Sequence, residues 1–237
     1  MPEPVVLIAW IDFLDPWSYV VTARIEQLAP LYGDRIQLEW RAFMRYPEKR
    51  EWSLEDYRAE TTKWLEPASA EPKLAFSLWS TGASPPTHSA PALVAALVAG
   101  DEDASRAPDY WHLLFVAHFE RNLNVSDPAV LIELASEVGY DEMAFAARLR
   151  GSYADYVKKV VDDHNEALRR GITDVPAVIV AYEYLVKGAA TVEQYRELLD
   201  GLLPAEPEQP AESEEPAERE EPAKSEEPAE PEQPAAS

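Results

Sequence analysis

The segment DFLDPWS, residues 12–18, places two carboxylates, an indole and a hydroxyl within seven positions. It follows an apolar run and precedes a helical pattern, so it is expected at a strand-to-helix turn. Asp is a preferred N-cap residue and Pro a preferred first helical residue, so Asp15 and Pro16 predict a carboxylate that accepts hydrogen bonds from the first helical turn. We expect Asp15 to be ionised and Ser18 to be a candidate hydrogen-bond donor.

The sequence contains no cysteine. Disulfides, thiolate metal sites and cysteine nucleophiles therefore cannot be formed by these 237 residues. The four histidines show no H-E-x-x-H or comparable spacing, which predicts no metal site. Phosphate-binding loops, dinucleotide fingerprints and G-x-S-x-G motifs are also missing from the sequence.

The elements that must hold this loop form the pattern β-α-β, then helices, then β-β-α. Strands are predicted at 4–12 and 35–43, with a helix at 16–32 between them. Further helices are expected at 53–66, 87–100, 109–121, 127–139, 141–151 and 152–171, and Gly139 and Gly171 are typical helix ends. Two strands over 177–188 and a final helix at 191–203 complete the chain.

Charge and composition limit the partners. The formal net charge is −23, which disfavours nucleic acid and anionic membranes as partners. No apolar stretch reaches the roughly 20 residues of a membrane span, and no basic region precedes the first strand, so a cytoplasmic protein is expected. From residue 204 the sequence repeats units such as EEPAER, which predicts a disordered acidic tail, 204–237.

Three motifs resemble the DsbA family, in particular its FrnE-like branch, over about residues 4–203. DFLDPWS lies where those proteins have D-F-x-C-P-W-C. GITDVP, residues 171–176, is similar to G-V-x-G-V-P, and FERNLNVSDPAVLIELASEVG, residues 119–139, is similar to a segment of their helical insert. The resemblance implies an α/β thioredoxin-like fold, with 1–43 and 172–203 forming the thioredoxin-like domain and 44–171 a helical insertion domain.

The family carries cysteines at the positions of Asp15 and Ser18, so the resemblance implies the architecture of a disulfide oxidoreductase without its dithiol. It also implies a cis bond between Val175 and Pro176. A groove between these residues and Trp17 is then expected to bind a peptide or a small molecule. Several tryptophans are candidates to line an apolar groove beside the insertion, with ordinary core packing as the alternative: Trp17, Trp40, Trp52, Trp64, Trp79 and Trp111.

A second branch has a similar loop, S-P-Y-S, in kappa-class glutathione transferases and 2-hydroxychromene-2-carboxylate isomerases. That resemblance implies glutathione or another low-molecular-weight thiol as a cofactor, with Ser18 and His88 assisting. His88 begins an insert helix that leans over the loop in the family, which makes it the candidate for proton transfer, although such a histidine is often incidental. Asp15 departs from the S-P-Y-S pattern, which has serine at this position. A carboxylate there would repel the thiolate of the cofactor. Two hypotheses follow: a cysteine-less, redox-inactive binding protein, or a thiol-dependent isomerase or transferase.

Overall fold

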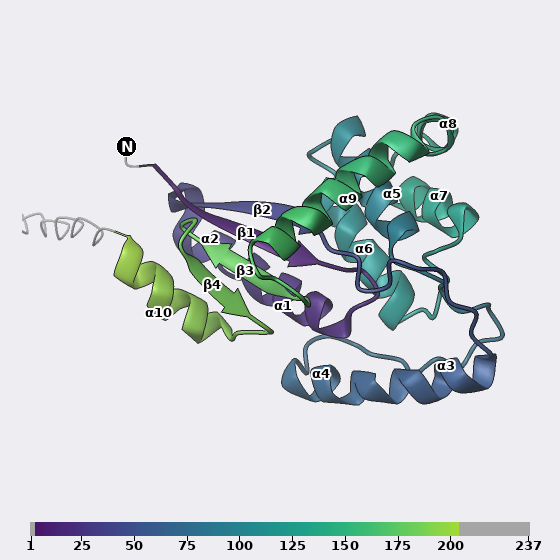
Figure 1. Ribbon diagram of the computed structural model, residues 1–237, viewed down its shortest axis with the longest axis horizontal. Helices are drawn as coiled ribbons and strands as arrows, with labels where there is room; N and C mark the ends of the chain where they lie inside the picture. The colour runs from purple at the N-terminus through teal and green to yellow at the C-terminus, as the bar shows by residue number, and fades with distance from the viewer. Residues whose placement is uncertain (1–2, 204–237) are drawn as a thin grey trace, which may run out of the picture. The chain divides into compact units, whose positions relative to one another are not determined.

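The computed structural model describes residues 3–203, so the predicted tail lies outside the described residues. A four-stranded sheet has the order β2-β1-β3-β4. β1 (Val5–Ile11) pairs in parallel with β2 (Ile36–Ala42) and antiparallel with β3 (Ala177–Val180), which in turn pairs antiparallel with β4 (Tyr184–Lys187). The central sheet is thus built from segments near both ends of the described chain (Figure 1).

β1 is the central strand and is apolar on both faces, as expected for a strand that is covered on both sides. Its side chains alternate, and Leu7 and Ala9 face one core with helices α1 (Pro16–Glu26) and α10 (Val192–Leu202). On the opposite face Ile8 and Trp10 pack with Ala167 of helix α9 (Tyr153–Arg169), which crosses that face in Figure 1. The α/β thioredoxin-like fold predicted from the sequence is confirmed.

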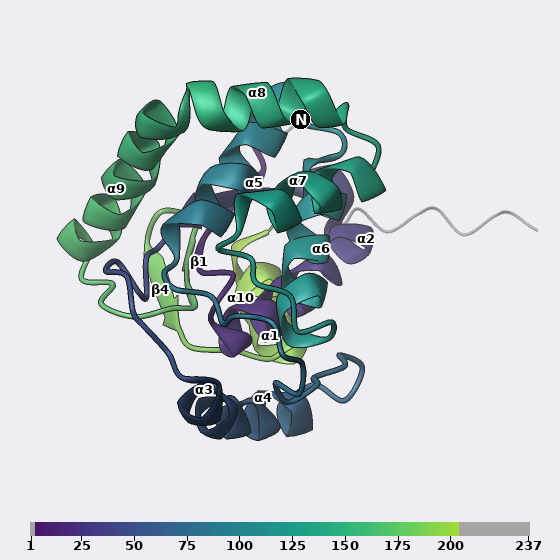
Figure 2. The same cartoon turned by 90° about the vertical axis from the view of Figure 1, so that its right-hand side faces the viewer.

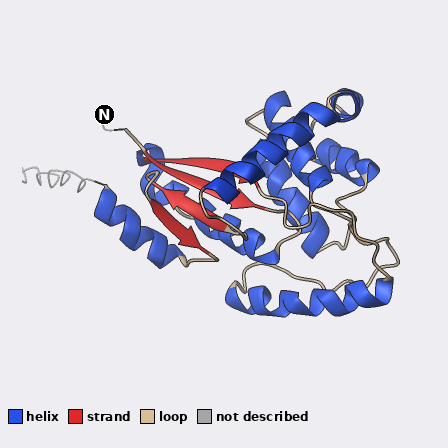
Figure 3. Ribbon diagram, viewed as in Figure 1, coloured by secondary structure: helices blue, strands red, loops and turns tan. Residues whose placement is uncertain are grey.

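Seven helices lie between β2 and β3 in the chain, and Figure 3 shows them gathered beside the strands. Their main core is mostly aliphatic and aromatic and includes the loop residues Phe13 and Leu14. In Figures 1 and 2, α3 and α4 run along a side of their own, apart from the other helices of the insertion. The helices are α3 (Leu54–Thr61), α4 (Leu65–Ala70), α5 (Ala90–Glu102), α6 (Ala107–Phe119), α7 (Pro128–Glu137), α8 (Glu142–Gly151) and α9.

The structure corrects three predicted helices. The helix expected at 16–32 is interrupted: α1 ends at Glu26, and a short α2 (Ala29–Tyr32) and a 3-10 turn (Gly33–Arg35) follow. Pro30 explains this break, because its ring lacks an N–H and clashes with the carbonyl four residues earlier. The helix expected at 53–66 comprises α3, a 3-10 turn (Thr62–Trp64) and α4, which extends to Ala70.

The third correction concerns the helix expected at 87–100, which begins only at Ala90, one residue before Pro91, and continues to Glu102. The predicted helix ends are confirmed by left-handed backbone at Gly139 (φ 89°) and Gly171 (φ 76°). Thr191 and Gln194 form the capping box that starts α10. The boundary between a thioredoxin-like domain and an insertion domain stays a prediction.

The buried side chain of Arg24 connects three distant segments. Its Nε donates to Glu71 Oε2 at 2.9 Å, and its Nη2 donates to the carbonyl of Ala70 at 2.8 Å, at the end of α4. Its Nη1 donates to the carbonyl of Ala189 at 2.7 Å, in the loop before α10. Arg24 belongs to α1, so one guanidinium joins α1, α4 and the loop between β4 and α10.

Candidate functional site

The loop between β1 and α1 holds Asp15 as predicted, at the N-cap of α1. The Asp15 Oδ2 atom accepts hydrogen bonds from the backbone N–H of Ser18 at 2.6 Å and from the Ser18 hydroxyl at 2.8 Å. Both residues are completely buried. The Ser18 Oγ atom also accepts a hydrogen bond from the Asp12 backbone N–H at 3.3 Å. The hydroxyl of Ser18 is therefore used within the loop.

Asp12 is a second carboxylate with no exposed surface. Its Oδ1 accepts from the backbone N–H of Leu14 at 2.9 Å, and its Oδ2 accepts from the backbone N–H of Arg45 at 2.7 Å. The hydroxyl of Ser89 also donates to Oδ2. Asp12 thus joins the loop after β1 to the segment after β2 and to the start of α5.

Arg45 is a site residue that the sequence did not reveal. Its guanidinium Nη1 donates to Asp15 Oδ1 and lies 4.0 Å from Asp174 Oδ1. One signal was available: β1 and β2 are parallel neighbours, so the residues that follow Ile11 and Ala42 meet at one edge of the sheet. Arg45 comes three residues after that end of β2.

Burial changes the charge state that we expected for Asp15. Loss of hydration raises the pKa of Asp15 to about 7, while the charge of Arg45 and the hydrogen bonds from Ser18 act in the opposite direction. Nearby Asp12 adds to the increase, and burial also raises the pKa of Asp12 itself. Asp15 was expected to be ionised, and burial instead raises its pKa into the neutral range, so its charge depends on Arg45 and Ser18.

The segment before β3 approaches the same site. The bond between Val175 and Pro176 is cis, as expected. The Val175 backbone N–H donates to Asp174 Oδ1 at 2.9 Å. The link between this segment and the loop is made by Asp174, through Arg45.

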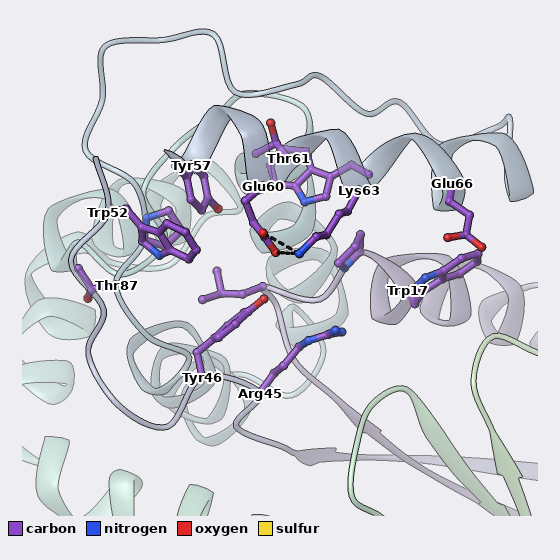
Figure 4. A pocket seen from close by; sticks show the side chains of 14 residues that line it. Trp17, Arg45, Tyr46, Trp52, Tyr57, Glu60, Thr61, Lys63, Glu66 and Thr87 are labelled. Carbon is purple, nitrogen blue, oxygen red and sulfur yellow. Dashed lines mark hydrogen bonds and ion pairs between the residues drawn. The ribbon is translucent and has the colours of Figure 1, made fainter. Parts of the chain in front are cut away.

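A cavity of about 230 Å³ opens beside the loop, on the side of α3 and α4 (Figure 4). Neither Val175 nor Pro176 is among its lining residues, whereas Pro16 and Trp17 are. Aromatic side chains dominate the wall, and two cations and two carboxylates lie among them. The aromatic and charged lining residues are Trp17, Arg45, Tyr46, Trp52, Tyr57, Glu60, Lys63, Trp64 and Glu66.

The expected tryptophan groove is therefore formed in part. Trp17, Trp52 and Trp64 line the cavity. Trp79 is buried, which matches the packing alternative. Trp40 and Trp111 meet edge to face at 6.5 Å and line a separate apolar depression between α1, β2 and α6.

Comparison with known families decides the identity of this architecture. The model of the DSBA-like thioredoxin domain matches residues 6–200. The chain belongs to this family. None of the curated proteins matches it. Several solved structures share the fold of this DSBA-like domain, at sequence identities that show the fold alone.

A protein named as a disulfide isomerase, from Nitrosomonas europaea, has a TM-score of 0.71 and 19% identity, over 84% of this chain and 97% of its own. The cytosolic disulfide reductase DsbM from Pseudomonas aeruginosa, with GSH, has a TM-score of 0.67 and 17% identity, over 83% and 98%. A 2-hydroxychromene-2-carboxylate isomerase has a TM-score of 0.57 and 15% identity, over 83% and 95%.

His88 of this DSBA-like domain is not joined to the loop. Its Nδ1 lies 2.8 Å from the Thr87 hydroxyl, and within residues 3–203 it makes no hydrogen bond with Asp15 or Ser18. Burial lowers the pKa of His88. The residue that reaches the loop is its neighbour Ser89, through Asp12.

A different histidine supports the cavity wall. His118 is buried, and its Nε2 lies 3.2 Å from the hydroxyl of Tyr57, which lines the cavity. Burial lowers the pKa of His118 to about 3, so its ring is neutral at physiological pH. The sequence placed His118 in a helix but gave no sign of this contact, because Tyr57 lies 61 residues away.

Within residues 3–203, no group of three or more His, Cys, Asp and Glu side chains is arranged to hold a metal ion. In the same range, no helix is long and apolar enough to cross a membrane.

Proposed function

We propose that this DSBA-like domain is a binding protein that lacks thiol–disulfide activity of its own and takes a peptide or a small molecule in the cavity beside the loop. One observation carries the proposal. The polar groups of Asp15 and Ser18 are buried and bonded within the protein, while the aromatic cavity next to them stays open. The polar groups of Asp15 and Ser18 are thus not available to a ligand, whereas the aromatic surface of the cavity is, which suits a binding site.

The thiol-dependent alternative receives no specific support from the geometry. The Ser18 hydroxyl would have to donate to a thiolate, but it donates to Asp15. An ionised carboxylate at this place would also repel a thiolate, by about 4 kcal/mol at about 4 Å with an effective dielectric constant near 20. Glutathione remains a ligand to be tested, since structures with this fold include one with GSH.

A ligand screen by thermal shift tests the proposal, with glutathione, other small thiols, extended peptides and aromatic acids as arms. We expect a saturable increase in Tm for at least one ligand, and no catalysed insulin reduction. Trp52→Ala should remove the shift, because its ring lines the cavity. Trp111→Ala is the matched control, since this half-buried tryptophan lies outside the cavity.

Two results would contradict the proposal. Turnover of insulin disulfides by the pure protein would contradict the proposed lack of thiol–disulfide activity. A thermal shift that is lost equally in both tryptophan variants would place the ligand elsewhere and contradict the proposed binding in the cavity.

A further inference from the structure

Arg45 connects a buried acid to the open cavity. One nitrogen of its guanidinium, Nη1, donates to Asp15, which has no exposed surface. The Arg45 side chain is itself 34% exposed and lines the cavity. Its Nε and Nη2 make no hydrogen bond with any residue in 3–203, so N–H donors of this guanidinium are open to a ligand.

The other cation of the cavity wall is already occupied. Lys63 Nζ lies 2.7 Å from both carboxylate oxygens of Glu60, and Figure 4 shows this pair among the lining side chains. The free donors of Arg45 are therefore the better anchor for an anion. A guanidinium recognises a carboxylate through two parallel N–H bonds. The rings of Trp17 and Trp52 in the same wall offer apolar surface to the rest of such a ligand.

Several charged and polar groups lie around Asp15 and Arg45. Asp12 lies in the same loop, and the hydroxyl and backbone N–H of Ser18 come from α1. From the segment before β3, Asp174 approaches Arg45. Tyr46, after β2, lies close enough to Arg45 and Asp12 for their charges to act on it. Arg45 is the cation that stabilises the charge of Asp15, so an anion placed on Arg45 also acts on Asp15.

We propose that Arg45 binds the carboxylate of a ligand with an apolar ring in this cavity, and that Asp15 is protonated in the resulting complex. This inference rests on the proposed function and names its ligand chemistry. A second carboxylate on the same guanidinium weakens the attraction that keeps Asp15 ionised. The proton comes from solvent and adds to the Asp15 carboxylate, and no covalent bond of the ligand changes.

The position of the Asp15 titration makes this coupling measurable. Its pKa of about 7 means that the Asp15 carboxyl of the ligand-free protein is partly ionised at neutral pH. Protonation on binding then takes up about half a proton at pH 7 and almost none near pH 5. The same linkage makes the dissociation constant about tenfold larger at pH 8 than at pH 6, so binding is weaker at the higher pH.

Isothermal titration calorimetry in buffers of different ionisation enthalpy measures both quantities. The probes are N-acetyl-phenylalanine, which represents a peptide C-terminus, and 2-naphthoate, which represents a free organic acid. N-acetyl-phenylalanine amide is the neutral control. We expect proton uptake and pH-dependent affinity for the acids and neither for the amide. The acid that binds more tightly identifies the source of the carboxylate.

Asp15→Asn tests the coupling, because Asn keeps an oxygen that accepts from the Ser18 backbone N–H and cannot titrate. We expect its affinity for the acids to equal that of the wild type at pH 6, with no proton uptake and no change up to pH 8. Arg45→Gln, made on the Asp15→Asn background so that no buried acid loses its partner, should weaken acid binding at least tenfold. Lys63→Gln tests the competing cation of the cavity wall and should weaken acid binding less than Arg45→Gln does.

Three outcomes would overturn the inference. The acids and the amide bind equally at every pH, or Lys63→Gln removes acid binding while Arg45→Gln does not, or neither acid binds. In the first two cases the cavity still binds ligands, so the proposed function stands. In the third case, the proposed function fails too when no ligand of the thermal-shift screen raises the Tm.

Discussion

The N-termini of α1 and α8 begin with the same residue in two different surroundings. Asp15 accepts from the backbone N–H of Ser18 at 2.6 Å, and Asp141 accepts from the backbone N–H of Ala144 at 2.7 Å. The capping hydrogen bond is thus nearly the same in both helices. Asp141 is exposed, however, whereas Asp15 has no exposed surface. A capping rule therefore fixes the first hydrogen bond of a helix but not the burial of its cap.

Tertiary position causes the difference. Asp15 lies where the segments after β1 and β2 meet the segment before β3, and it contacts Ser18 and Arg45. Asp141 lies between two surface helices of the insertion, α7 and α8. Water can hydrate the carboxylate of Asp141, while the Asp15 carboxylate depends on the protein for every polar contact.

The largest expected effect is on the pH dependence of stability. The pKa of Asp15 is raised to about 7 in the folded protein, so below that pH the folded state binds more protons than the unfolded state. The contribution of Asp15 to stability is therefore largest at low pH and is lost as the pH rises through 7. For Asp15 alone we expect a loss of about 2–3 kcal/mol in the free energy of unfolding between pH 5 and pH 8, measured by urea denaturation.

Asp15→Asn should remove this loss and leave the slope that arises from other groups such as Asp12, whose pKa burial also raises. Asp141→Asn is the control and should keep the full slope of the wild type. Identical slopes in the two variants would show that Asp15 does not titrate as the structure indicates.

A second, smaller effect isolates Arg45, whose charge is the strongest influence that opposes the increase in the pKa of Asp15. Arg45→Gln should raise that pKa by about one unit, equivalent to about 1.4 kcal/mol. The measurement is the pH at which the loss of stability levels off, which should move upward. Arg121→Gln, which breaks the exposed pair with Glu137, should leave that pH unchanged.

The smallest effect belongs to the exposed cap. Asp141→Ala removes one side-chain hydrogen bond at the start of α8 and should cost about 1 kcal/mol in the free energy of unfolding. The cost should be the same at pH 5 and pH 8, as measured by urea denaturation. A cost that changes strongly with pH would mean that the two caps are less different than their burial indicates.

Much of the fold was predictable from the sequence because local signals agreed with each other. The apolar run of β1, the glycines after α7 and α9 and the capping box of α10 each act within a few residues. The break between α1 and α2 was visible as Pro30, but the apolar pattern on both sides of it favoured one long helix. Helix propensity alone did not decide between one continuous helix and two helices separated at Pro30.

The candidate site was predictable only in its local part. The N-cap role of Asp15 follows from the tetrapeptide DPWS. Its pKa does not, because it depends on burial and on Arg45, which is 30 residues away. The contact of Ser89 with Asp12 spans 77 residues. The sequence suggested His88 for proton transfer. The contact between His118 and the Tyr57 hydroxyl of the cavity wall corresponds to no sequence motif.

Arg24 gives the site a mechanical property. Its guanidinium fastens the far end of α4, and Glu66 of the same helix borders the cavity. Arg24 itself lies two turns along the helix that Asp15 begins. A ligand that pushes the α4 wall outward would therefore also load the hydrogen bonds by which Arg24 ties α4 to α1.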